Sequence, residues 1–403
     1  MVYKITFFSV LKQKLGYNYY MSKKIWKLVL FFFLIFFVGT ISFFLLLFYL
    51  RSSEEYPYPY QFANSFMYSN KVEISNSDII FLGDKMGVQL GKYENEIQKY
   101  VKTKTQLKFK NLSLPGEGLH RTLLKLKNLS SKPKLIIYHG GSDEFRETVY
   151  LFSQIKKIQA NIQRFKSPIT RGISSKASWI TKIIFTPMEK KIIPIDIPQT
   201  KTIVPKEFQF LNFEINNSLY YLHLHELIHY SKLQNIPLLI ITTPINLEIM
   251  PKSVCLASSN KEIMNLQNEI FQLYKNQEYK LALSRVKELV TVSKGNALNY
   301  YLLGILEAKN GLWDDSRMSL EMASSFDCGF WRTNLVNNQI LIDIANKNEI
   351  KVIDFHAMIH LFWGKNTLFV DEIYPQHLYY TLLAQAIGES INSFLEKDKI
   401  YKE

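Results

Sequence analysis

Residues 79–87, Ile79-Ile80-Phe81-Leu82-Gly83-Asp84-Lys85-Met86-Gly87, are the stretch from which the fold of this chain follows. Four apolar residues stand in a row, and the glycine and aspartate come directly after them. Such a run, closed by a turn signal, predicts a buried strand that ends in a loop. In open α/β sheets, ligands bind at the loops that follow the carboxyl ends of the strands. We therefore expect Lys85 to lie at a ligand site.

Two more strand-loop-helix units follow in the sequence. Residues 107–112 alternate between apolar and polar side chains and lead, through a Pro-Gly turn, into the helical pattern of 119–129. Residues 135–138 are another apolar run, which ends in His139-Gly140-Gly141-Ser142-Asp143. Repeated units of this kind predict a parallel sheet covered by helices. Later apolar runs at 237–244 and 350–354 supply two further strands of this α/β domain.

Three of the loops together resemble the conserved blocks of the SGNH/GDSL hydrolase family. Gly83-Asp84-Lys85 is similar to the first block, Gly-Asp-Ser, and Gly116 matches the glycine of the second. Gly140-Gly141-Ser142-Asp143 is similar to the third block, Gly-x-Asn-Asp, with serine in place of asparagine. Near the C-terminus, Asp371-Glu372-Ile373-Tyr374-Pro375 resembles the last block, Asp-x-x-His-Pro. The resemblance extends over about 77–394.

The resemblance implies a flavodoxin-like three-layer α/β/α SGNH-hydrolase fold and a site for acyl esters. In this family the serine attacks the ester, the histidine is its base, and the aspartate orients the histidine. Two backbone amides and the asparagine side chain stabilise the oxyanion. Carried over by position, the implied site residues are Lys85, Gly116, Ser142, Asp371 and Tyr374, with His377 as a nearby substitute base.

The nucleophile and base positions hold residues that cannot act in the usual way. Lys85 offers no hydroxyl, and a phenol such as Tyr374, with an ordinary pKa near 10, is a poor base. We therefore expect a catalytically degenerate member that binds acylated cell-envelope glycan or lipid. We also expect the Lys85 ammonium to pair with Asp371, directly or through the Tyr374 hydroxyl. An active acyl-ester hydrolase or O-acetyltransferase that uses His377 remains an alternative.

The N-terminal segment predicts a membrane anchor. Residues 28–50 are 23 uncharged residues, rich in Phe and Leu, which is long enough to span a bilayer. The first 51 residues contain seven Lys and Arg and no acid, and six of the seven precede the span. The positive-inside rule then places residues 1–27 in the cytoplasm and the C-terminal domain outside it. Residues 51–75, with Pro57 and Pro59, predict an extended linker.

Charge and cysteine content narrow the classes of partner. The net charge is +14, but there is no arginine-rich tract and no basic patch interleaved with aromatic residues. We therefore expect no nucleic-acid partner. Cys255 and Cys328 both lie in the part predicted to be outside, where a disulfide can form. Within the segment 150–216, whose role the sequence does not indicate, residues 164–208 contain five prolines and little periodicity and predict a long surface excursion.

Residues 263–326 predict a helical insert between two parts of the α/β domain, 76–262 and 327–397. Tyr279, Ala282 and Val286 recur 34 residues later as Trp313, Ser316 and Leu320. A period of 34 with small and aromatic positions resembles the tetratricopeptide repeat, in which helical hairpins stack on one another. The insert either presents a surface to a protein partner or packs on the main domain.

A second motif lies before the fourth predicted strand. His225-Glu226-Leu227-Ile228-His229 matches the zinc-peptidase pattern, in which two histidines on one helical face bind the metal and the glutamate is the base. The motif falls on a helix, 217–233, that runs directly into a strand of the sheet, and no third ligand is marked. We therefore predict no metal and no cofactor, with a zinc metallopeptidase as a further alternative.

Overall fold

The computed structural model describes residues 27–49, 72–74, 77–103, 106–144, 155–176, 208–251, 260–329 and 333–400. The chain divides into two compact units, residues 1–57 with 164–184, and residues 58–163 with 185–403. The first unit contains the helix Lys27–Tyr49, which is long and apolar enough to cross a membrane. Most of the predicted linker, 51–75, lies outside the described residues.

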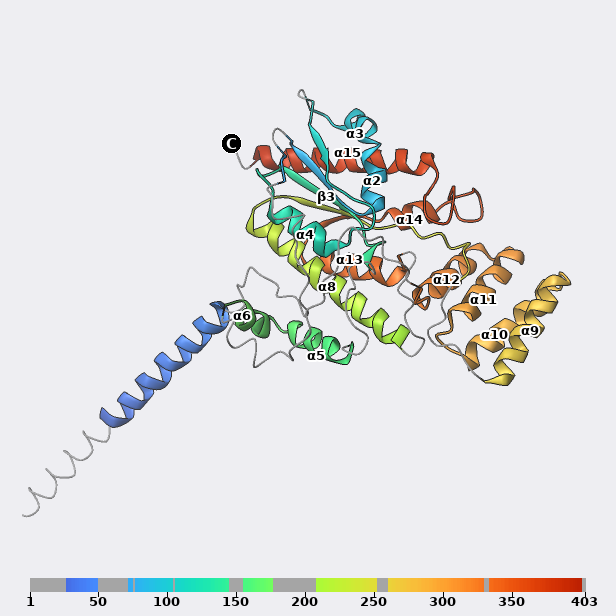
Figure 1. Cartoon of the computed structure of the whole chain (residues 1–403), viewed down its shortest axis with the longest axis horizontal. Helices are drawn as coiled ribbons and strands as arrows, with labels where there is room; N and C mark the ends of the chain where they lie inside the picture. Colours follow the sequence, from blue (N-terminus) through green and yellow to red (C-terminus); the bar gives the residue numbers. More distant parts are fainter. Residues whose placement is uncertain are drawn as a thin grey trace, which may run out of the picture. The chain divides into compact units, whose positions relative to one another are not determined.

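A five-stranded parallel sheet forms the centre of the second unit (Figure 1). Its order is β2-β1-β3-β4-β5, which is the flavodoxin-like order of doubly wound sheets. All neighbouring strands are parallel, so the loops that follow them lie along one edge. The five predicted strands are confirmed as β1 Ile79–Gly83, β2 Phe109–Asn111, β3 Leu135–His139, β4 Leu238–Ile241 and β5 Lys351–Ile353.

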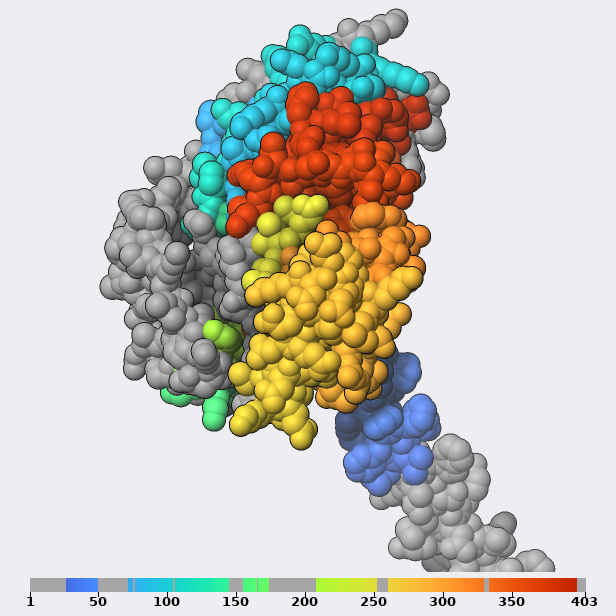
Figure 2. Space-filling view, turned by 90° about the vertical axis from the view of Figure 1, so that its right-hand side faces the viewer, coloured from blue at the N-terminus to red at the C-terminus, as the bar shows by residue number. Residues whose placement is uncertain are grey.

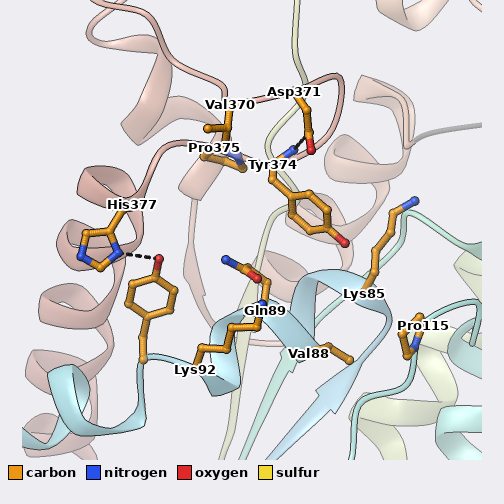
Figure 3. Close-up of a pocket in the computed structure, with 11 residues that line it drawn as sticks. Lys85, Val88, Gln89, Lys92, Pro115, Val370, Asp371, Tyr374, Pro375 and His377 are labelled. Carbon is orange, nitrogen blue, oxygen red and sulfur yellow. Dashed lines mark hydrogen bonds between the residues drawn. The ribbon is translucent and has the colours of Figure 1, made fainter.

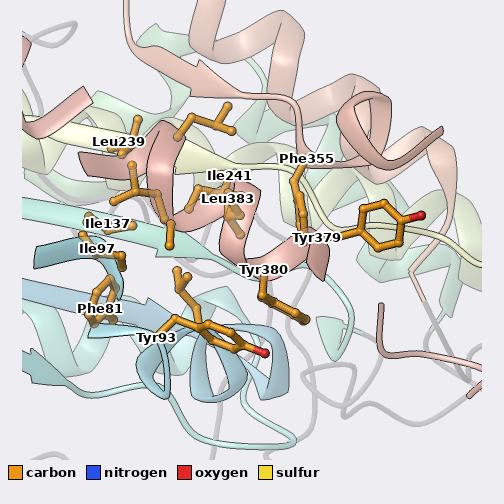
Figure 4. Close-up of a cluster of buried hydrophobic side chains, with 14 of the residues drawn as sticks. Phe81, Tyr93, Ile97, Ile137, Leu239, Ile241, Phe355, Tyr379, Tyr380 and Leu383 are labelled. Atoms are coloured by element: carbon orange, nitrogen blue, oxygen red, sulfur yellow. The ribbon is translucent and has the colours of Figure 1, made fainter. Parts of the chain in front are cut away.

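Helices cover both faces of the sheet because successive strand residues point to opposite sides. Phe81 is fully buried in one apolar cluster with side chains of α3 (Glu94–Tyr100), α14 (Phe355–His360) and α15 (His377–Ile400) (Figure 4). Leu82, also fully buried, belongs to the cluster on the other face. That face is covered by α4 (Leu119–Lys127), α8 (Gln209–Leu233) and α13 (Leu335–Lys347). The result is a three-layer α/β/α sandwich.

Between β4 and α13 the chain forms two helical hairpins. Close contact of α11 with α12 depends on Gly304, where an added Cβ would lie 2.5 Å from Leu320 Cγ. Leu320 also packs with Ile245 and Leu247, which follow β4. Figure 2 shows these hairpins, in yellow and orange, beside the red C-terminal part of the chain. The helices are α9 Lys261–Lys275, α10 Tyr279–Val292, α11 Ala297–Lys309 and α12 Trp313–Ser325.

The repeat-like helices are thus attached to the α/β domain by direct packing, and the repeat family itself remains a prediction. Glu321 on α12 also reaches the α/β domain, with its Oε1 3.6 Å from His356 Nε2 on α14. Cys328, just after α12, is 1% exposed and disulfide-bonded. Cys255, the other cysteine of the chain, lies outside the described residues.

Some helix bounds differ from the sequence-based expectation. The helix α2, Lys85–Gly91, starts where only a loop was expected, and it follows β1 after a single residue, Asp84. The helix α8 begins at Gln209 rather than at the predicted Asn217. Helices lie before and inside the predicted excursion, 164–208, as α5 (Ile155–Phe165) and α6 (Pro168–Lys176). Residues 177–207 lie outside the described residues.

The end of β1 yields a test of the fold. Gly83 has φ +145°, and an added Cβ would lie 2.0 Å from the carbonyl oxygen of His139 on β3. Gly311 has φ +78° but open space around it. We expect Gly311→Ala to lower the free energy of unfolding by about 1–2 kcal/mol through backbone strain alone. Gly83→Ala should lower it by at least ~3 kcal/mol, because a strand must also move.

Urea unfolding of the two variants measures both losses under the same conditions. A Gly83→Ala variant that loses no more stability than Gly311→Ala would contradict the close approach of β1 to β3.

Candidate functional site

A groove of about 440 Å³ lies between α2 and the segment that leads into α15 (Figure 3). One wall is a single face of α2, because Lys85, Val88, Gln89 and Lys92 stand at helical spacing. The helix begins here because the Asp84 side chain caps it by accepting a hydrogen bond from Met86 N at 2.8 Å. The rest of the groove is lined by Tyr93, Pro115, Val370, Asp371, Tyr374, Pro375 and His377.

Four of the six predicted site residues share this groove. Lys85, Asp371, Tyr374 and His377 all line it, although they come from opposite ends of the domain sequence. Gly116 comes directly after a lining residue, Pro115. Ser142 is buried behind the groove, where it touches Asp84. The structure therefore gathers the predicted residues in one place, and their roles remain predictions.

Asp84 joins the loops that follow β1 and β3. Its carboxylate is 1% exposed. One oxygen accepts from Met86 N, and the other accepts from Ser142 N at 2.6 Å, Ser142 Oγ at 2.8 Å and Asp143 N at 3.1 Å. Burial raises the pKa of Asp84 to about 6, and the nearby charge of Asp143 acts in the same direction. Four donors thus hold a carboxylate that burial alone would destabilise.

Asp143 is the second buried carboxylate at this edge of the sheet, also 1% exposed. Its Oδ2 accepts a hydrogen bond from Gly116 N at 2.9 Å, and its Oδ1 lies 3.5 Å from Lys85 Nζ. The Lys85 side chain is itself only 13% exposed. A buried carboxylate is costly without a counter-charge, so Lys85 is well placed to stabilise it.

The predicted pair between Lys85 and Asp371 is therefore wrong. Lys85 forms its ion pair with Asp143 instead. The physical reason is burial, since Asp143 has lost its water whereas Asp371 is exposed. The carboxylate of Asp371 is hydrogen-bonded within its own loop, where Oδ1 accepts from Ile373 N at 2.7 Å and from Tyr374 N at 2.6 Å. Figure 3 shows the Asp371 carboxylate beside the backbone nitrogen of Tyr374.

Two of the predicted oxyanion donors already serve these carboxylates. The Gly116 amide donates to Asp143, and the Ser142 hydroxyl donates to Asp84. A donor stabilises an oxyanion only when it points at the place where that charge develops. In this arrangement, internal anions take up two of the three donors that the resemblance assigns to the oxyanion.

His377 lies at the other end of the groove from Lys85 (Figure 3). Its Nδ1 is 2.8 Å from the Tyr93 hydroxyl, and the two rings are 5.2 Å apart. Gln89 also hydrogen-bonds this hydroxyl. Both contacts are satisfied when Gln89 donates to the hydroxyl and the hydroxyl donates to Nδ1. Burial raises the pKa of Tyr93, so its phenol stays protonated.

The zinc-peptidase motif lies on α8, and its glutamate has a different partner. Glu226 Oε1 accepts from Lys127 Nζ at 2.6 Å, and the His225 ring packs edge-on against Tyr221 with centroids 4.7 Å apart. Among the residues that the structure describes, no group of three His, Cys, Asp or Glu side chains is arranged to hold a metal ion. No proposal through zinc is made here.

Several residues of the groove region escaped the sequence-based prediction. Gln89, Lys92 and Tyr93 line the groove, and Asp143 governs the position of Lys85. Helical periodicity counted from Lys85 would have found Gln89 and Lys92. Nothing in the sequence pattern shows that Asp143 turns inward, because a loop aspartate has no periodicity that reports its burial.

Comparisons with known proteins add little to this geometry. No protein-family model and no curated protein matches the chain. Among solved structures, it is similar to the crystal structure of a "putative acylhydrolase" from Bacteroides fragilis, with 10% sequence identity and a TM-score of 0.31. The match covers 81% of this chain and 91% of that one. At this TM-score the similarity carries no argument, so function must be argued from the site itself.

The carboxylate network yields a paired prediction. In Asp84 both oxygens accept hydrogen bonds, so Asp84→Asn would turn an NH₂ group toward an N–H donor. We expect it to lower the free energy of unfolding by about 2–4 kcal/mol, even though it removes a buried charge. In Asp371 both bonds go to Oδ1, which asparagine can keep, so Asp371→Asn should change stability by less than ~0.5 kcal/mol.

Denaturant unfolding of both variants provides the comparison. Unchanged or increased stability in Asp84→Asn would show that the charge, rather than the hydrogen bonds, dominates at this position.

Proposed function

We propose that this chain is a membrane-anchored, extracytoplasmic protein of the SGNH/GDSL type that binds acylated cell-envelope glycan or lipid without hydrolysing it. One observation carries the proposal: Asp143 and Asp84 accept the hydrogen bonds of the Gly116 amide and the Ser142 hydroxyl. An ester carbonyl that entered the groove would meet donors that are already engaged.

The family assignment is supported by the placement of the blocks. The loops after β1, β2 and β3 are neighbours because the strand order is β2-β1-β3. Asp84 bonds the first loop to the third, and Gly116 bonds the second to the third. The segment around Asp371 and Tyr374 lines the same groove as Lys85. This is the gathering of blocks that the resemblance implies, with lysine and tyrosine in place of the nucleophile and the base.

The proposed location rests on the N-terminal segment and on Cys328. One described helix is long and apolar enough to span a membrane, and six of the seven basic residues near it precede it. This asymmetry favours an exterior C-terminal domain. The disulfide at Cys328 agrees with an oxidising compartment. A protein partner at the insert is part of the proposal, since Met318 and Met322 are exposed one helical turn apart on α12.

A second candidate function is residual acyl-ester hydrolysis through His377. The hydrogen bond between its Nδ1 and the Tyr93 hydroxyl is the arrangement of a base with its hydroxyl partner. The raised pKa of Tyr93 works against attack by this phenol. The first candidate is therefore preferred.

An acetyl-ester hydrolysis assay on the full chain tests the proposal. We expect the wild type, Lys85→Ala and His377→Ala all to match the rate without protein, since the Tyr93 phenol has a raised pKa and the Gly116 and Ser142 donors are engaged by carboxylates. Activity in the wild type that survives Lys85→Ala and is lost in His377→Ala would establish the second candidate. Activity abolished by a chelator would point to the zinc alternative.

Protease accessibility tests the proposed topology. Protease added to intact cells with a permeabilised outer layer should digest the C-terminal domain, because the basic N-terminal segment holds residues 1–27 inside. Immunoblotting with an antibody against the C-terminal domain follows the digestion, and a cytoplasmic protein serves as the control. Full protection of the domain would overturn the proposed location.

A further inference from the structure

The walls of the groove carry an excess of positive charge and hydrogen-bond donors. Lys85 and Lys92 lie at the two ends of one face of α2, with the Gln89 amide between them. Lys92 is exposed and makes no side-chain ion pair within the described part of the chain. Across the groove stand the Tyr374 hydroxyl and the His377 ring. A ligand that accepts hydrogen bonds and carries negative charge fits these walls.

The acids of the groove cancel this charge only in part. Among the described lining residues two lysines face one acid, Asp371, whose Oδ1 accepts two backbone N–H groups. Asp143 lies behind Lys85 and is 1% exposed, so it compensates Lys85 without entering the groove. Lys92 is left as the least compensated charge, at the end of the groove near Tyr93.

Exposed aliphatic side chains lie in the lining of this groove or next to a lining residue in the sequence. Val370, which lines it, is 72% exposed, and Leu378, directly after His377, is 56% exposed. Leu114, directly before the lining residue Pro115, is 44% exposed. Apolar side chains gathered around one groove mark a binding surface more than isolated ones do. Together with the lysines, these aliphatic side chains fit a ligand that has both a charged group and an apolar chain.

The border favours acyl chains over sugar rings. A sugar is usually held by an open aromatic face. Of the two described lining tyrosines, Tyr93 is already covered by His377 at 5.2 Å and by Tyr380 at 5.0 Å, so Tyr374 alone is left to meet a sugar ring. Aliphatic side chains such as Val370 offer area to a hydrocarbon chain and little to a hydroxyl-rich ring.

We infer that the groove binds an anionic phospholipid. The phosphate lies between Lys92 and Lys85, and the acyl chains lie along Val370, Leu378 and Leu114. The groove volume of about 440 Å³ is in the range of small-molecule sites, and it accommodates the headgroup while the chains rest on the border. The inference rests on the proposed function, because it names the ligand class of the same groove. It does not depend on whether esters are hydrolysed.

Calorimetric titration of the full chain in a neutral detergent tests the inference. The probes are dihexanoyl phosphatidylglycerol, the matched phosphatidylcholine, and glycerol 3-phosphate. We expect phosphatidylglycerol to bind at least ~10-fold more tightly than either of the others, because phosphatidylcholine lacks net charge and glycerol 3-phosphate lacks acyl chains.

Two variants locate the site. Lys92→Gln should weaken phosphatidylglycerol binding about 10-fold, as expected for the loss of a charge-assisted hydrogen bond. Lys110→Gln, at an exposed position on β2 outside the groove, is the matched control and should change nothing. Val370→Asn should weaken binding of phosphatidylglycerol and leave that of glycerol 3-phosphate unchanged.

Equal affinity for the two lipids, or full affinity in Lys92→Gln, would overturn the inference. Glycerol 3-phosphate that binds as tightly as the lipid would assign the groove to a free phosphate instead. Binding of an O-acetylated glucosamine oligomer, with no binding of phosphatidylglycerol, would assign it to a glycan. Absent lipid binding together with absent hydrolysis rejects this inference alone, whereas ester hydrolysis with intact lipid binding rejects only the proposed lack of activity.

Discussion

The buried carboxylate of Asp84 is the interaction on which the arrangement of the groove depends. It starts α2 by capping it, and it fixes the loop after β3 through Ser142 and Asp143. With the strands held parallel and in register, those bonds leave the two loops little freedom. Asp84 therefore fixes the backbone positions of Lys85 and Asp143, although Asp84 itself does not line the groove.

The presence of a lysine at position 85 is explained by its ion pair with Asp143. Two buried carboxylates lie close enough that Asp143 raises the pKa of Asp84. Lys85 supplies a positive charge 3.5 Å from Asp143 Oδ1 and reduces the repulsion that burial would intensify. A serine at this position would leave Asp143 with the Gly116 amide but without this cation. The lysine is thus consistent with its surroundings, as the counter-charge of Asp143 at the wall of the groove.

Much of the fold could be predicted from the sequence, and less of the site. Runs such as 79–82 and 135–138 are buried on both faces, and this continuous apolar character identified the strands and their parallel arrangement. The pairing of Lys85 could not be predicted, because it depends on how deeply Asp143 and Asp371 are buried. The pattern of apolar and polar residues does not show how deeply the side chain of a loop residue is buried. Lys92 could not be predicted for a simpler reason. The sequence analysis expects a loop after Asp84, whereas the helix α2 brings Lys92 to the same face as Lys85.

The central claim is that the charged and polar groups behind the groove pair with one another, as Lys85 does with Asp143, and that no lining residue is an activated nucleophile. Labelling of the full chain with a fluorophosphonate ester, followed by mass spectrometry of the intact chain and its peptides, tests it most directly. Such a reagent forms a stable adduct where a nucleophile is paired with a base and an oxyanion site is free. The account predicts no adduct on any residue that lines the groove or on Ser142. A stoichiometric adduct on Ser142, Tyr93 or Lys85 would contradict it.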